Sequence, residues 1–262
     1  HHISLLNLFY EESTRTRLSF DLAAKKLGIS VLNLDPKRSS EAKGESMADM
    51  LQTIAAMGIN ILVMRHPDDD VFSRVVSTIP TELKLLNAGN GMLAHPTQAM
   101  LDIMTMLEQK IVLQDAKIVV VGDILHSRVA GSLQRLCALL GVKELVFTGP
   151  RAWLPDALEY GDMTDSLSDA LEDADVVMTL RVQRERFTPE ESLNFDAYRK
   201  QYAITEALLS HAKPNACVLH PGPMNRGVEI DSAVADGPQS CILKQVENGV
   251  FIRMAILEAL IK

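Results

Sequence analysis

The stretch Lys117-Ile-Val-Val-Val-Gly122 begins the part of the sequence that decides the fold. Its apolar run predicts a short strand that ends at a glycine. The next apolar residues recur with the helical period, at Val129, Leu133, Leu136, Cys137 and Leu140. A second apolar run, 145–148, follows at once. A strand, a helix and a further strand in succession indicate a parallel sheet covered by helices, which is an α/β fold.

The same alternation extends outward through almost the whole chain. The other expected strands are 4–8, 31–34, 59–64, 83–87, 176–180 and 217–219. Between them, Met47, Met50, Leu51 and Ile54 again follow the helical period. Three helical runs end at Gly28, Gly58 and Gly141, directly before strands, where a left-handed C-terminal cap is expected.

Two helical stretches predict how the chain is divided into domains. The stretch 98–110 contains no glycine or proline and joins the two halves, and the stretch 241–262 closes the chain. We therefore expect two domains, each a parallel sheet flanked by helices, joined by interdomain helices. Residues 1–98 with 241–262 form the first, and residues 99–240 form the second.

Composition excludes several classes of protein. The 262 residues carry a formal net charge of −8, which argues against a protein that lies along nucleic acid. Three scattered cysteines without paired spacing indicate neither a disulfide framework nor a zinc site, and fit a reducing, cytosolic setting. The apolar runs are far shorter than the roughly 20 residues of a membrane-spanning helix. Asp123, His126 and His211 lack further ligands at a recognisable spacing, so no metal site is expected.

Polar residues follow the expected strands directly. Arg65 follows the strand 59–64, Arg181 and Gln183 follow 176–180, and His220-Pro-Gly-Pro follows 217–219. Ligands of open parallel sheets bind beyond the carboxyl ends of the strands. Guanidinium groups at this edge, in a chain of negative net charge, predict an anionic substrate.

The segment Ser13-Thr-Arg-Thr16 lies between a strand and a helical pattern, so its hydroxyls and backbone N–H groups can surround a phosphate. Ordinary N-capping by serine or threonine is the alternative. Neither the Walker motif GxxxxGK[ST] nor GxGxxG is present, which disfavours a nicotinamide dehydrogenase. A glycine-containing loop delivers His95 and Gln98 to the start of the connecting helix, and the run 37–44 is typical of an exposed loop.

In combination these motifs are more specific than any of them alone. Phe9-Tyr-Glu-Glu-Ser-Thr-Arg-Thr16 resembles the carbamoyl-phosphate signature of the aspartate and ornithine carbamoyltransferases, and His95-Pro-Thr-Gln98 resembles their HPxQ motif. The stretches 180–186 and 220–227 resemble the aspartate branch, since the ornithine enzymes carry an HCLP-type element in place of His-Pro-Gly-Pro. The resemblance extends from about Asn7 to the final helix. Members usually have a helix and a strand before this point, so the N-terminus is either truncated or natively short.

The resemblance implies roles for individual residues. Catalysis would fall to Arg15, Thr16, Arg65 and His95. Carbamoyl phosphate would be bound by Ser13, Thr14, Arg15, Thr16, Ser39, Arg65, His95, Gln98 and the carbonyls of Pro221 and Gly222. Aspartate would be bound by Lys43, Arg128, Arg181 and Gln183. Ser39 and Lys43 match a loop that, in the family, enters the active site of the neighbouring subunit.

Three further arginines are expected to lie outside the chemistry. Arg226 is expected to make an ion pair that shapes the Pro-Gly-Pro turn, with Glu229 as a candidate partner. Arg184 and Arg186 are expected to be solvated or paired with Glu185.

The implied reaction transfers the carbamoyl group of carbamoyl phosphate to L-aspartate and releases phosphate, in de novo pyrimidine biosynthesis. The resemblance implies a cytoplasmic homotrimer with shared active sites, no cofactor, and domains that close on aspartate binding. Regulatory chains or a dihydroorotase are further candidate partners, whereas nucleic acid and membranes are not. Two alternatives stay open: a carbamoyltransferase with another amino acceptor, and a catalytically silent paralogue that serves as an oligomer scaffold.

Overall fold

A computed structural model of the chain describes residues 2–183 and 195–262, which fall into two compact units. Unit 1 consists of His1–Thr97 and Val246–Lys262, and unit 2 consists of Gln98–Gln245. The sequence placed these boundaries at 98 and 241. Helices α4 (Pro96–Glu108) and α10 (Ile242–Ile261) each contain residues of both units.

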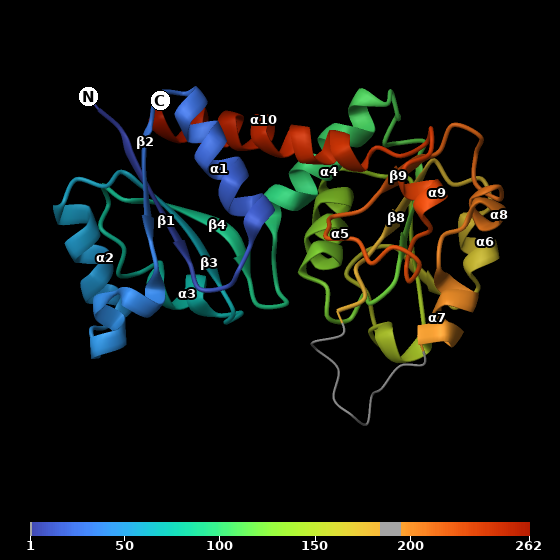
Figure 1. Ribbon diagram of the computed structural model, residues 1–262, viewed down its shortest axis with the longest axis horizontal. Coiled ribbons are helices and arrows are strands. Elements are labelled where there is room, and N and C mark those ends of the chain that lie inside the picture. Colours follow the sequence, from blue (N-terminus) through green and yellow to red (C-terminus); the bar gives the residue numbers. More distant parts are fainter. Residues whose placement is uncertain (1, 184–194) are drawn as a thin grey trace. The chain divides into compact units, whose positions relative to one another are not determined.

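Unit 1 is built on a four-stranded parallel sheet (Figure 1). Its strands are β1 (Ser4–Phe9), β2 (Ser30–Leu34), β3 (Ile61–His66) and β4 (Lys84–Asn90), in the order β2-β1-β3-β4. Its helices are α1 (Thr14–Lys26), α2 (Met47–Ala56) and α3 (Val71–Val75), with 3-10 turns η1 (Pro36–Arg38) and η2 (Ser40–Lys43).

Successive strand residues of unit 1 enter different cores, as the two-residue period of a strand requires. Leu5 and Ile61 pack with Phe20 of α1 and with Leu257 of α10. Their chain neighbours Leu6 and Leu62 pack in a second cluster, which α2 and α3 complete with Met50, Leu51, Ile54, Val71 and Val75. The sheet is therefore covered on both faces.

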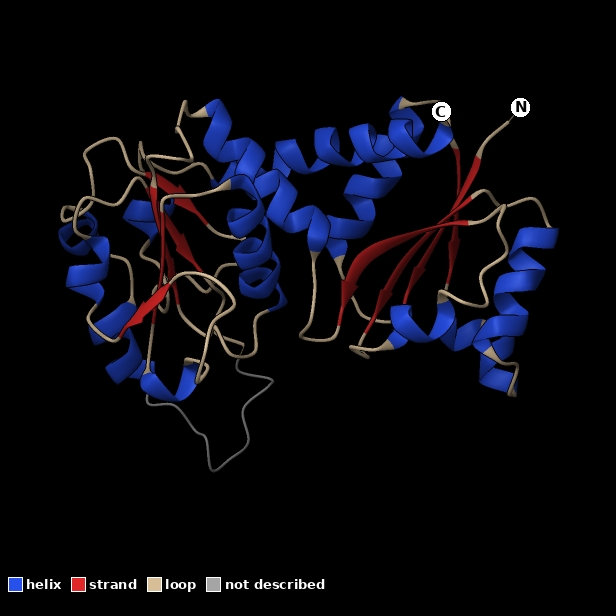
Figure 2. Ribbon diagram, turned by 180° about the vertical axis from the view of Figure 1, so that it is seen from behind, coloured by secondary structure: helices blue, strands red, loops and turns tan. Residues whose placement is uncertain are grey.

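Unit 2 contains a five-stranded parallel sheet (Figure 2). The strands are β5 (Lys117–Val121), β6 (Glu144–Thr148), β7 (Asp162–Thr164), β8 (Val176–Thr179) and β9 (Cys217–Leu219), in the order β7-β6-β5-β8-β9. The remaining elements are α5 (Arg128–Leu140), η3 (Arg151–Trp153), α6 (Leu167–Leu171), α7 (Phe195–Tyr202), α8 (Glu206–Leu209) and α9 (Ser232–Ala235). Val119 and Ile118 lie in separate buried clusters, so this sheet too is covered on both faces.

The predicted α/β class and the two helix-flanked parallel sheets are confirmed. Every expected strand is present within a few residues, and within the described ranges the strand that the sequence missed is β7. It is three residues long at the edge of its sheet and only partly buried, so it carries no apolar run. Among residues 2–183 and 195–262, no helix combines the length and the apolar character needed to cross a bilayer.

Glycine is required at two places beside the strands of unit 2. Gly141 ends α5 with φ +66°, and its α-carbon faces open space. Gly149 follows β6, and a β-carbon added there would lie 2.3 Å from the carbonyl oxygen of Gly122. The first position therefore restricts the backbone conformation, whereas the second requires close contact between two backbones.

We predict that Gly149→Ala destabilises the protein more than Gly141→Ala. The left-handed conformation should cost Gly141→Ala about 1 kcal/mol. The overlap at Gly149 forces two strand ends apart, for which about 3 kcal/mol is expected. Urea unfolding of the two variants measures the difference, and equal midpoints would contradict the close approach.

Candidate active site

Each sheet has one place where the strand order reverses, and several of the predicted site residues follow the strands at these places. In unit 1 the order β2-β1-β3-β4 reverses between β1 and β3. In unit 2 the order β7-β6-β5-β8-β9 reverses between β5 and β8. Loops leave such neighbouring strands in opposite directions and open a crevice at their carboxyl ends, where α/β proteins bind ligands.

The segment after β1 forms the amino end of α1. Ser13 is the N-cap residue, and its side chain makes no capping hydrogen bond. Thr14 and Arg15 are exposed, and Thr16 is buried. A helix amino end attracts anions through its unpaired N–H groups and its dipole. Ordinary side-chain capping, the alternative interpretation of this motif, is not what the structure contains.

Arg65 is the last residue but one of β3 and lies next to this segment. Its side chain is buried, and its Nε donates a hydrogen bond of 3.1 Å to the carboxylate of Glu11, which lies just after β1. The backbone N–H of Tyr10 donates to the carbonyl oxygen of Arg65 at 2.9 Å. The ends of β1 and β3 are therefore tied together, and the guanidinium is held in a restricted position.

His95 and Ser39 come from the two outer strands of unit 1. His95 is buried and lies between β4 and the start of α4. Ser39 lies in the loop after β2, and its hydroxyl donates to the carbonyl oxygen of Pro36 at 2.8 Å. The four carboxyl strand ends of this sheet thus all lead to residues predicted to bind carbamoyl phosphate, with Ser39 predicted to do so in the site of a neighbouring subunit.

Tyr10 fastens the loop that carries Ser39 and Lys43. Its hydroxyl donates to the carboxylate of Glu41, and its ring meets that of His66 edge-on, with centroids 4.5 Å apart. Burial, reinforced by Glu41, raises the pKa of Tyr10, and burial lowers the pKa of His66. Lys43 itself is exposed.

The predicted aspartate residues of unit 2 come from the neighbouring strands β5 and β8. Arg128 is the first residue of α5, which Ser127 caps by accepting from the Ala130 N–H at 3.2 Å. Asp123 fixes the preceding turn, because its carboxylate contacts the backbone and the ring of His126. Arg181 and Gln183 lie two and four residues after the end of β8 and are partly buried. The stretch 184–186 of the same motif lies outside the described residues.

Gln98, at the start of α4, is oriented by a buried carboxylate. Its Nε2 donates to Asp102 Oδ1 at 2.9 Å, and Gln245 Nε2 donates to the same oxygen at 2.8 Å. The amide group of Gln98 is thereby set with its nitrogen toward Asp102. Its oxygen is then the atom that can accept a hydrogen bond from a ligand.

Pro221 and Gly222 follow β9, the strand beside β8, and Gly222 precedes a cis peptide bond to Pro223. The expected pairing of Arg226 with Glu229 is wrong. Arg226 makes two hydrogen bonds to Asp236, of 2.6 and 2.8 Å, on the surface. Glu229 is instead fully buried against His220.

Sequence reasoning did not include two buried groups near these strand ends. Asp102 follows Gln98 by one helical turn in an otherwise apolar stretch, a spacing at which side chains meet, so a signal was present. Tyr198 of α7 is almost fully buried, and burial raises its pKa. No pattern around Tyr198 in the sequence distinguishes it from an ordinary core residue.

Comparison with known proteins places this geometry in a family. Residues 1–108 match the model of the aspartate/ornithine carbamoyltransferase carbamoyl-P binding domain, and residues 114–260 match that of the Asp/Orn binding domain. The chain belongs to the aspartate/ornithine carbamoyltransferase family.

Relatives from the two branches of the family differ in sequence identity to this chain but share its fold. A curated aspartate carbamoyltransferase catalytic subunit of Legionella pneumophila (strain Corby) is 54% identical over 257 residues, which cover 98% of this chain and 86% of the relative. The aspartate transcarbamoylase of Trypanosoma cruzi, solved with carbamoyl aspartate and phosphate, has a TM-score of 0.87 at 32% identity, covering 97% of this chain and 82% of the other. The ornithine carbamoyltransferase of Pyrococcus furiosus also reaches 0.87, at 27% identity, covering 98% and 84%. The fold is thus shared by both branches, and sequence identity favours the aspartate branch.

Proposed function

We propose that the protein is an aspartate carbamoyltransferase. It transfers the carbamoyl group of carbamoyl phosphate to the amine of L-aspartate and forms N-carbamoyl-L-aspartate and phosphate, a step of de novo pyrimidine biosynthesis. The observation that carries the proposal is the position of the family motifs at the carboxyl ends of the parallel strands, with the phosphate motif, Arg65, Arg128 and Arg181 at the strands where each sheet reverses its order. The 54% identity to a curated catalytic subunit supports the choice of aspartate.

Carbamoyl phosphate is assigned to the group around the amino end of α1. Ser13, Thr14, Arg15 and Thr16 supply hydroxyls, N–H groups and a guanidinium for the phosphate. Arg65 adds a second guanidinium, which binds phosphate oxygens in a bidentate manner. The oxygen of Gln98 and the carbonyls of Pro221 and Gly222 accept hydrogen bonds from the carbamoyl NH2 group.

The chemistry needs cations and donors but no covalent intermediate on the protein. The uncharged amine of aspartate attacks the carbamoyl carbon, and the carbonyl oxygen acquires negative charge in a tetrahedral intermediate. The C–O bond to phosphate then breaks, and the proton lost by the amine leaves with phosphate or solvent. Thr16, Arg65 and His95 stabilise the oxyanion, and the phosphate ligands stabilise the leaving group.

Aspartate is assigned to Arg128, Arg181, Gln183 and Lys43. Two guanidinium groups match two carboxylates, because each can form a pair of parallel N–H···O bonds with a carboxylate. The binding of this second anion by a chain of net charge −8 requires such a local concentration of positive charge.

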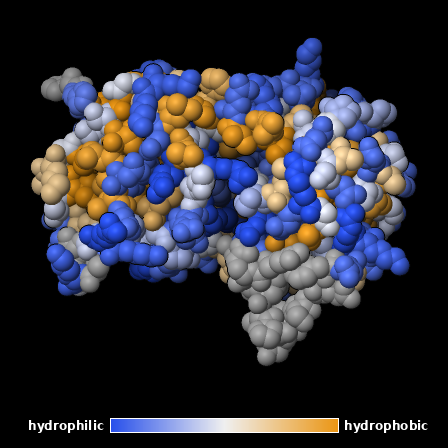
Figure 3. Space-filling view, in the orientation of Figure 1, coloured by the Kyte–Doolittle hydropathy of each residue, from blue (hydrophilic) through white to orange (hydrophobic). Residues whose placement is uncertain are grey.

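The active form is proposed to be a cytoplasmic homotrimer in which Ser39 and Lys43 complete the site of the neighbouring subunit. Two features of unit 1 support an interface. Leu18 and Leu22 are exposed one turn apart on α1, and Leu32 is exposed on the edge strand β2. Figure 3 shows apolar side chains on the surface over these elements. Exposed apolar groups gathered in this way are typical of protein interfaces.

The test is an acceptor competition. We expect purified protein to release phosphate from carbamoyl phosphate and to form carbamoyl-aspartate when L-aspartate and L-ornithine are both present, without product from ornithine. Product from ornithine alone would contradict the aspartate assignment and leave the phosphate site intact. No turnover in a protein verified as a trimer would favour the silent scaffold. Sedimentation of the same sample measures its oligomeric state.

A further inference from the structure

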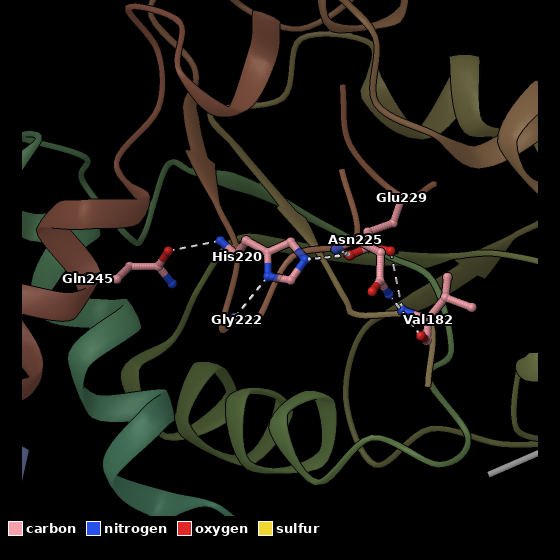
Figure 4. A network of polar contacts seen from close by, with 6 residues as sticks. All are labelled: Val182, His220, Gly222, Asn225, Glu229 and Gln245. Atoms are coloured by element: carbon pink, nitrogen blue, oxygen red, sulfur yellow. Dashed lines mark hydrogen bonds and ion pairs between the residues drawn. The ribbon is translucent and has the colours of Figure 1, made fainter. Parts of the chain in front are cut away.

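A buried network in unit 2 connects Gly222, a proposed ligand of carbamoyl phosphate, with Val182, which stands in the sequence between two proposed ligands of aspartate (Figure 4). At its centre lie His220 and Glu229, whose side chains are fully buried and joined by a contact of 3.1 Å between Nε2 and Oε1. Neither residue is among the proposed ligands. Burying a charge is costly unless several hydrogen bonds compensate it. The other hydrogen-bond partners of His220 and Glu229 therefore indicate the role of the pair.

The first set of partners fixes the turn after β9. The backbone N–H of Gly222 donates to His220 Nδ1 at 2.8 Å. Because a backbone N–H can only donate, Nδ1 has to be the unprotonated nitrogen, and the proton of the neutral ring resides on Nε2, where it is donated to Glu229. Holding the Gly222 N–H also holds the preceding carbonyl group, that of Pro221, because both belong to one planar peptide unit.

The second set of partners reaches the stretch after β8. The N–H of Asn225 donates to Glu229 Oε1 at 2.5 Å, and the N–H of Val182 lies 3.5 Å from Oε2. Asn225 Nδ2 in turn donates to the carbonyl oxygen of Val182 at 3.0 Å. Val182 is buried, and its chain neighbours Arg181 and Gln183 are proposed aspartate ligands. The backbone position of Val182 therefore determines the positions of the α-carbons from which those two side chains extend.

The network continues toward α4. The backbone N–H of His220 donates to Gln245 Oε1 at 2.8 Å. Gln245 and Gln98 both donate to Asp102, as described above. An unbroken series of hydrogen bonds therefore runs from Gln98 to Val182 within one unit.

We infer that His220 and Glu229 are positioning residues for carbamoyl transfer. This inference rests on the proposed function. The pair holds two parts of the site at a fixed separation: the carbonyl groups that accept hydrogen bonds from the carbamoyl NH2 group, and the backbone that carries the aspartate ligands. Alignment of two reactants is a large part of such a rate enhancement, and a displacement of about 1 Å can cost about 10²-fold in rate.

Three substitutions separate the two arms of the network. Glu229→Gln retains an acceptor for His220 but presents an NH2 group to the Val182 N–H, so we expect the KM for aspartate to rise about tenfold. His220→Gln retains a donor toward Glu229 but removes the acceptor of Gly222, so we expect kcat to fall about tenfold. His220→Asn returns an acceptor near the Nδ1 position and should recover part of kcat. Asp236→Asn, which removes the charge that pairs with Arg226 on the surface, serves as the control and should change both constants less than about twofold.

A purely structural role predicts a different result: thermal stability falls while KM and the rate per folded molecule stay as in the wild type. That result, or equal losses of both constants in Glu229→Gln and His220→Gln, would overturn the inference. An inactive wild-type protein would overturn the proposed function and this inference together, whereas an active wild type with unaltered variants would overturn the inference alone.

A spectroscopic measurement on the wild type decides the case even if a variant fails to fold. In protein with 15N-labelled histidine and glycine, a scalar coupling between Gly222 N and His220 Nδ1 across their hydrogen bond assigns the ring signals to His220 and identifies the nitrogen that accepts. We expect an unprotonated Nδ1 and a protonated Nε2 at neutral pH. A protonated Nδ1 cannot accept the Gly222 N–H, so its detection would refute the arrangement.

Discussion

Arg65→Ala is expected to lower kcat about 10²–10³-fold, with a smaller change in the KM for carbamoyl phosphate. Arg65 is buried at the end of β3, and Glu11 restricts its guanidinium. A preorganised cation of this kind favours the transition state most, because negative charge on the carbonyl oxygen develops only there. Steady-state kinetics with both substrates varied will measure the two constants.

Two further variants sharpen this prediction. Arg65→Lys keeps the charge but loses the planar fork of donors, so it should recover only part of the rate. Arg74→Ala is the matched control, because Arg74 forms an exposed pair with Asp68 in the same unit and should leave kcat nearly unchanged. If Arg65→Ala altered only the KM for carbamoyl phosphate, Arg65 would contribute ground-state binding and no stabilisation of the transition state.

The fold could be predicted from the sequence because buried parallel strands leave a strong local signal. Runs such as 118–121 are apolar throughout, since both faces of the sheet are covered. Helices α2 and α5 were equally evident from the period of their apolar residues. Elements without such a signal were missed: β7 lies at an edge, and α3 and α6 are only five residues long. An element like β7 is stabilised by pairing with the neighbouring strand β6, and its own three residues carry no apolar run that predicts a strand.

For the candidate site, the motifs identified residues but not their partners. Guanidinium and hydroxyl groups after strands could be recognised from order alone. The partner of Glu229 could not be predicted, because Arg226 is only three residues away and carries the opposite charge, whereas His220 is nine residues away across a turn. Charge complementarity favoured the nearer residue. The different burial of the residues explains the observed pairing. Arg226 stays on the surface and pairs with Asp236, whereas the buried carboxylate of Glu229 pairs with the buried ring of His220.

Arg181→Ala is expected to reduce kcat/KM for aspartate about 10–100-fold while leaving the binding of carbamoyl phosphate unchanged. Hydrogen bonds between charged groups contribute about 1.5–3 kcal/mol each, which corresponds to this range. Arg181 follows β8 in unit 2, whereas the phosphate ligands Ser13, Thr14, Arg15 and Thr16 lie in unit 1. Kinetics with aspartate varied, together with direct binding of carbamoyl phosphate by calorimetry, will separate the two effects.

The control for this variant is Arg135→Ala. Arg135 pairs with Glu159 on the surface of the same unit, so its removal takes away an arginine of unit 2 without touching a strand end. Equal losses in both variants would mean that the net charge of the unit attracts aspartate, and that Arg181 has no specific role. A loss that occurs only in Arg181→Ala, and that high salt does not reproduce in the wild type, would instead indicate a direct contact between Arg181 and a substrate carboxylate. Salt screening weakens long-range attraction far more than it weakens a paired hydrogen bond.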